Sequence, residues 1–160
     1  MSSKKIAYIS MFSALAIVFG YIESLFPAAP VPGIKLGLSN IVILFAIYRM
    51  DKASAFFIML IKVLVTSLLF SGLNVFLYSF FGGLLSLVAM VGFKKIFSVI
   101  GVSMIGGVCH NIGQLLVASF MLQTSAVFVY LPALLISGII VGFVTGTVCN
   151  IVLKRKNITI

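Results

Sequence analysis

Long apolar runs, interrupted only by short basic clusters, constrain the fold of this chain more than any other feature of its sequence. Hydrophobic residues make up 62% of the 160 residues and charged residues only 8%, whereas soluble chains carry roughly 25% charge. A soluble domain of this length could not hide so much apolar surface. The composition therefore predicts an all-α integral membrane protein.

The lengths of the apolar runs indicate how often the chain crosses the membrane. A helix rises 1.5 Å per residue, so it needs about 20 residues to cross a hydrocarbon core of about 30 Å. On this measure we expect a single domain with six spans, of which the second is short and the last two are long. The predicted spans are approximately 6–26, 36–50, 53–71, 74–93, 97–122 and 126–153.

Basic residues lie in alternate connections between these spans, which predicts the orientation of the bundle. Positive charge is enriched on the cytoplasmic side of membrane proteins, so both termini are expected in the cytoplasm. This pattern also explains the net charge of +9 better than phosphate contacts would, and no nucleic-acid partner is expected. Only Lys35 falls on the opposite side from the clusters at Lys4, Lys5, Arg49, Lys52, Lys94, Lys95, Lys154, Arg155 and Lys156.

Lys62 lies midway along the third predicted span. Inserting a lysine at that depth costs about 2.5–3.5 kcal/mol on membrane-insertion scales, unless another group compensates the charge. The chain has two acidic residues, Glu23 and Asp51, and neither is expected at the depth of Lys62. An ion pair between Glu23 and Lys35 belongs to the structural alternative for Lys35. Lys62 is therefore predicted to contact an anionic ligand. Hydrogen bonds to carbonyl groups or to a facing amide are the structural alternative.

A second polar group, in the fifth predicted span, consists of His110, Asn111 and Gln114. His110 and Gln114 are one helical turn apart, and Asn111 is about 100° round the helix. Unpaired polar groups are costly in lipid, so this face must point into the bundle or into a wet cavity. Its depth is comparable with that of Lys62, which predicts a shared ligand site; interhelical hydrogen bonds are the alternative. No metal site is expected, because one histidine with two distant thiols is a poor ligand set.

The first external connection, residues 27–35, is rich in proline and therefore stiff. It is predicted to cover an outward-facing cavity, with a tight connector as the alternative. Lys35, at its end, is expected either to attract an anion or to act as a snorkelling anchor. Ser39 shares a helix face with Lys35; Asn40 lies next to it, and Asn74 is a candidate for the rim.

Small residues along the first predicted span indicate a second working surface. Ser10 and Ala14 are four residues apart, as are Ala16 and Gly20, and such spacing lets another helix approach closely. These residues are candidates for docking a partner membrane protein, with packing inside the bundle as the alternative. Close packing within the bundle is the favoured interpretation of the glycines in the last span, Gly138, Gly142 and Gly146.

Two motifs resemble those of a bacterial family: PVPGIKLGLSN at 30–40 and HNIGQ at 110–114. The family is that of heptaprenyl diphosphate synthase component I, also called the Gx transporter family. The six-span layout is also similar to that of the substrate-binding S components of energy-coupling-factor (ECF) transporters. S components hold a small molecule near the outer face and dock on a transmembrane coupling protein driven by ATPases. Their first helix typically carries Ala-x-x-x-Ala, from which this chain departs.

The resemblance implies a multi-pass protein of the bacterial plasma membrane that binds an anionic or amphipathic small molecule, cofactor-like or related to isoprenoids or flavins. The expected partners are membrane lipid, a coupling protein and its ATPases. The alternative is a non-catalytic accessory subunit of polyprenyl diphosphate or quinone synthesis, bound to a soluble prenyl synthase, or of an electron-transfer complex. No catalytic residue and no cofactor is expected, because prenyl synthases use Asp-rich clusters to hold Mg²⁺, and this chain has one Asp and one Glu.

Overall fold

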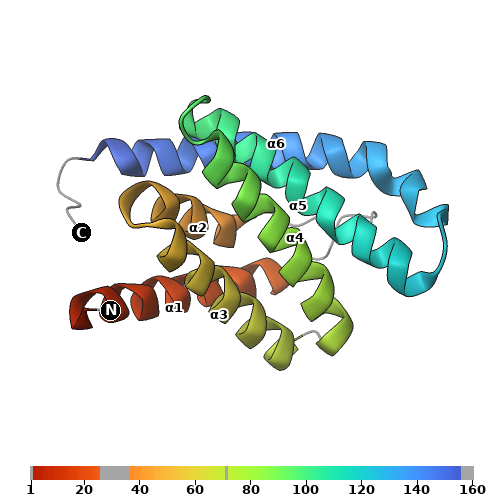
Figure 1. Cartoon of the computed structure of the whole chain (residues 1–160), viewed down its shortest axis with the longest axis horizontal. Coiled ribbons are helices and arrows are strands. Elements are labelled where there is room, and N and C mark those ends of the chain that lie inside the picture. The colour runs from red at the N-terminus through yellow and green to blue at the C-terminus, as the bar shows by residue number, and fades with distance from the viewer. Residues whose placement is uncertain (1, 26–36, 71, 156–160) are drawn as a thin grey trace.

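The computed structural model describes residues 2–25, 37–70 and 72–155, with the side chain of Phe70 left out (Figure 1). Every regular element in these ranges is a helix, as expected for long apolar runs that must satisfy their own backbone hydrogen bonds in lipid. The elements are α1 (Ser3–Leu25), α2 (Leu38–Arg49), α3 (Lys52–Phe70), α4 (Gly72–Phe93), α5 (Val99–Leu122), the 3₁₀ helix η1 (Ala126–Tyr130) and α6 (Leu131–Lys154).

Among the residues that the structure describes, five helical segments are long and apolar enough to cross a membrane: α1, α3, α4, α5, and η1 together with α6. The prediction of an all-α membrane protein is thereby confirmed. Helix α2 has 12 residues, which corresponds to about 18 Å and is shorter than a hydrocarbon core of about 30 Å. The number of spans and the cytoplasmic position of the termini stay predictions.

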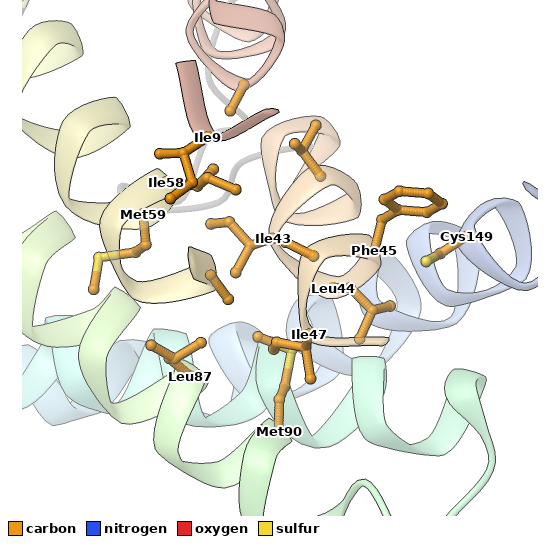
Figure 2. Close-up of a cluster of buried hydrophobic side chains, with 14 of the residues drawn as sticks. Ile9, Ile43, Leu44, Phe45, Ile47, Ile58, Met59, Leu87, Met90 and Cys149 are labelled. Atoms are coloured by element: carbon orange, nitrogen blue, oxygen red, sulfur yellow. The ribbon is translucent and has the colours of Figure 1, made fainter. Parts of the chain in front are cut away.

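The short helix α2 lies at the centre of the bundle. It packs against α1, α3, α4 and α6, and Figure 1 shows it between α1 and α6. Residues 42–47 are all buried, on every side of the helix, as expected for a helix that is apolar all round. Their side chains meet those of α1, α3, α4 and α6 in the main hydrophobic cluster, part of which is drawn in Figure 2.

Basic side chains tie several helix ends together at one end of the bundle, on the left of Figure 1. Lys5 forms an ion pair of 2.6 Å with Asp51, Arg49 donates a hydrogen bond of 2.6 Å to the carbonyl of Leu153, and Lys94 donates one of 2.6 Å to a carbonyl in the last turn of α2. Cations at helix C-termini are favourable because they bind the carbonyl groups that have no partner within the helix and interact with the negative end of the helix dipole. The basic clusters expected on one side of the membrane therefore meet at one end of the bundle.

Glycines allow α5 and α6 to touch through their backbones. A Cβ atom on Gly107 would collide with the carbonyl oxygen of Gly138, and one on Gly142 would lie 2.5 Å from the Cα of Met104. Gly146 faces α5 one turn further on. We call these four glycines (107, 138, 142 and 146) the glycine seam. The predicted close packing of the last span within the bundle is confirmed.

Candidate functional site

A cavity of about 30 Å³ lies where α1, α2, α3, α5 and α6 meet. This volume is enough for about two water molecules. Five of the residues that the sequence singled out for ligand binding line it, and they come from three helices: Ser39, Asn40, Lys62, His110 and Asn111. Lys62 and two of the three residues of the predicted polar face, His110 and Asn111, therefore line one cavity, while a shared ligand site stays a prediction.

Two other predicted site residues, Gln114 and Asn74, do not line this cavity. Gln114 turns towards α4, where its Cγ lies 2.8 Å from the position that a Cβ of Gly82 would take. Asn74 is exposed at the start of α4 and does not line the cavity. Lys35, with the proline-rich connection 27–35, lies outside the described residues.

Lys62 is half-buried on α3, and its side chain runs past α1 at Gly20. A Cβ on Gly20 would lie 3.7 Å from Cε of Lys62 and 3.2 Å from Cγ2 of Thr66. A side chain at Gly20 would therefore crowd the methyl group of Thr66, whereas it would only reach ordinary contact with the lysine stem. The hydroxyl of Thr66 donates a 2.8 Å hydrogen bond back to the carbonyl of Lys62.

This position of Gly20 bears on the docking surface that was predicted on α1. Ala16 is fully buried in the core, so the structure corrects its assignment to a docking surface. Gly20 packs against α3, as the alternative of internal packing requires. Ser10 and Ala14 are exposed and stay candidates for contact with a partner.

Glu23 lines the same cavity as Lys62, which corrects the expectation that no acidic residue lies near this lysine. Its carboxylate accepts a 2.5 Å hydrogen bond from the backbone N–H of Leu38 and one of 3.2 Å from the hydroxyl of Ser39. Counting along straight spans placed Glu23 too far from Lys62. In the structure, the end of α1 meets the start of the short central helix, beside which the lysine side chain extends.

Gly37, at the start of α2, forms another part of the cavity wall. Its φ of 71° lies in the left-handed region, which favours glycine. A Cβ there would also lie 2.6 Å from Cγ1 of Val141 on α6. Both constraints explain why this chain has glycine where the central helix enters the bundle.

Asn111 joins α5 to α6 at the cavity wall. Its side-chain nitrogen donates hydrogen bonds of 2.6 Å to the carbonyl of Leu134 and 3.3 Å to the hydroxyl of Ser137. The interhelical hydrogen bond considered as the alternative for Asn111 is thus present. Ser137, which also lines the cavity, had no distinguishing signal in the sequence, since the same apolar span also carries the hydroxyls of Thr145 and Thr147.

The described residues contain no group of three or more His, Cys, Asp or Glu side chains that could hold a metal ion. The two cysteines are free, Cys149 buried and Cys109 half-buried. What the cavity does offer is one ammonium group, one carboxylate, an imidazole, two amides and two hydroxyls. This chemistry is suited to binding a small polar molecule through charge and hydrogen bonds.

Comparisons with known proteins find one matching family and one similar solved structure, each over most of the chain. A family model described as "Heptaprenyl diphosphate synthase component I" matches residues 12–152. Among solved structures, the chain is similar to one titled "Structure and mechanism of the S component of a bacterial ECF transporter", with a TM-score of 0.73 and 24% identity, over 97% of this chain and 96% of that one. No curated protein matches the chain. The S-component-like fold is therefore confirmed, and the protein is a multi-pass membrane protein.

Proposed function

We propose that this chain, which belongs to the heptaprenyl diphosphate synthase component I family, is the substrate-binding membrane subunit of a small-molecule transporter. The observation that carries the proposal is the cavity at the meeting point of five helices, with Lys62, His110 and Asn40 on its wall. Ligand sites in membrane transporters commonly lie between helices. An ionisable side chain inside a membrane is costly, so it commonly marks such a site.

Lys62 would hold a negatively charged group of the ligand. An ammonium group attracts an anion more strongly in the bundle than in water, because the surrounding dielectric constant is lower. The imidazole of His110 and the amide of Asn40 would add hydrogen bonds that fix its orientation. Since the cavity measures about 30 Å³, a ligand larger than a few atoms requires side chains of the wall to move.

The acidic residues support a binding role over catalysis of prenyl chain elongation. Such chemistry uses Mg²⁺ held by clustered carboxylates. Asp51 is paired with Lys5 at the basic end of the bundle, whereas Glu23 lines the cavity. These two carboxylates belong to different regions of the protein and cannot act together on one diphosphate.

Transport would depend on partner proteins. The sequence carries no phosphate-binding loop, so ATP would be hydrolysed by separate subunits and coupled through a transmembrane protein. Ser10 and Ala14 are exposed small residues on α1 and would form part of the contact, since small residues allow close approach of another helix.

The test compares Lys62→Met with Lys52→Met, the same substitution on the same helix at an exposed position outside the cavity. A hydrogen bond to a charged group contributes about 1.5–3 kcal/mol, so Lys62→Met is expected to weaken ligand binding by about 10- to 100-fold. Native mass spectrometry of gently extracted protein measures the retained small molecule, and thermal melting checks that both variants are folded. Equal ligand retention by the two variants would rule out the central role of Lys62.

The family description itself favours a second candidate, a non-catalytic accessory subunit of a prenyl diphosphate synthase. In that case Lys62 would hold the diphosphate of a lipid substrate for a soluble enzyme. Co-purification distinguishes the two functions: a coupling protein with ATPases supports the transporter, and a soluble prenyl synthase supports the accessory subunit.

A further inference from the structure

The cavity carries one full charge of each sign among its described wall residues. Lys62 contributes an ammonium group and Glu23 a carboxylate, while the remaining polar groups of the wall are neutral amides, hydroxyls and the imidazole of His110. A ligand with only negative charge would be attracted by the lysine and repelled by the glutamate. The charge pattern therefore favours a molecule that has both signs itself.

Glu23 is held in this position by the start of α2. Its two oxygens accept hydrogen bonds from the N–H of Leu38 and the hydroxyl of Ser39. Both donors are neutral groups, so they orient the carboxylate without cancelling its charge. Each carboxylate oxygen can accept more than one hydrogen bond, so Glu23 can also accept one from a cationic group of a ligand.

The rest of the wall argues for a small and polar ligand. The imidazole of His110 is the one aromatic ring on the described wall, and Val141 is its one aliphatic side chain larger than glycine. Gly107 and Gly138 present backbone instead. Flat ring systems are usually bound between aromatic side chains, and prenyl chains between apolar ones. Neither kind of lining is present among the described wall residues.

We infer that the ligand of the proposed transport subunit is a small zwitterion of the α-amino-acid type. Its carboxylate lies against Lys62 and its ammonium group against Glu23, with Asn40 and His110 as hydrogen-bonding partners. This inference rests on the proposed function and narrows it. Specificity follows from the pair of charges, because only a ligand that carries both groups matches the sign of both charges on the wall.

The test measures thermal melting of the purified protein with matched probes. These are each standard L-α-amino acid, the 2-oxo acid that lacks its ammonium group, and the amine that lacks its carboxylate. Flavin mononucleotide and isopentenyl diphosphate serve as purely anionic probes. A ligand that binds only the folded state raises the melting temperature. We expect at least one amino acid to raise it by several degrees, and its oxo acid and amine to leave it unchanged.

Glu23→Gln supplies the second measurement, since glutamine keeps an oxygen for the N–H of Leu38 but has no charge. It is expected to weaken amino-acid binding at least 10-fold, while Lys52→Met leaves it unchanged. If an oxo acid or an anionic probe binds, and binds more tightly to Glu23→Gln, the zwitterion is refuted and the transport function survives. If no probe binds, the molecule retained in native mass spectrometry decides: one with both charges supports the inference, and one with acidic groups alone overturns it. If no molecule is retained either, the proposed function fails and this inference fails with it.

Discussion

The substitution Gly138→Ala tests how far the glycine seam holds the bundle together. Gly138 is buried where α6 crosses α5, and its neighbours across the seam are backbone atoms. A flexible side chain could turn away from an added methyl group, whereas a helix backbone can yield only if the two helices separate. The substitution is therefore expected to destabilise the protein although it adds a single carbon atom.

The size of the effect follows from the distances at the seam. A Cβ on Gly138 would lie 2.9 Å from the carbonyl carbon of Gly107, 2.9 Å from the nitrogen of Val108 and 3.0 Å from the oxygen of Gly107. Ordinary contacts begin near 3.4 Å, so α5 and α6 must move apart by about 0.5 Å, which removes about a quarter of the dispersion energy between facing atoms. Such overpacking typically costs about 1–3 kcal/mol. Alanine returns up to about 1 kcal/mol through its helix propensity, which leaves a net loss of about 1 kcal/mol.

The matched control is Gly92→Ala in α4. Gly92 is exposed and a Cβ there would meet no atom within 4 Å, so the gain in helix propensity acts alone. Unfolding in mixed detergent micelles, followed by far-UV circular dichroism, gives the free energy of unfolding for both variants. Gly138→Ala should be the less stable by about 2 kcal/mol, the sum of the net loss at the seam and the gain at the control. Equal stabilities would show that the helices are not held at backbone contact.

The features that the sequence predicted well are those that depend on local pattern. Apolar runs of membrane length identified the helices, because a segment must be apolar over about 20 residues to cross the hydrocarbon core as a helix. The four-residue spacing of glycines in the last span identified a face that packs on another helix, since residues at that spacing lie on one side. Alternating basic clusters indicated which helix ends would meet, and the contacts of Lys5, Arg49 and Lys94 bring them together.

Features that depend on how helices cross were not predictable in the same way. The pattern of α2 marks it as apolar, but not as a short helix enclosed by four others. Glu23 and Lys62 were placed at different depths because depth was counted along straight, parallel spans. Their common cavity arises because the end of α1, the start of α2 and the middle of α3 converge. Such convergence is a property of tertiary packing, and no single segment of the sequence encodes it.

Two further predictions concern side chains outside the cavity. Ser13 is 3% exposed, and its hydroxyl oxygen has no hydrogen-bond partner within the described part of the chain. Since an unsatisfied buried hydroxyl costs about 1–3 kcal/mol, Ser13→Ala should raise the free energy of unfolding by about 1 kcal/mol in the same assay. A decrease of that size would contradict the reasoning. At the basic end, hydrogen bonds from Lys5 and from the backbone N–H of Ser54 lower the pKa of Asp51 from 3.8 to about 2. The depressed pKa stabilises the folded state fully above about pH 4, and this contribution is lost as the pH falls from about 4 towards about 2. Asp51→Asn keeps an oxygen for Ser54 but loses the charge, and because the ion pair is partly exposed the cost at neutral pH should stay below about 1 kcal/mol. The stability difference between wild type and Asp51→Asn should therefore shrink over that acidic range, and a difference that is the same at every pH would mean that the ion pair is not its source.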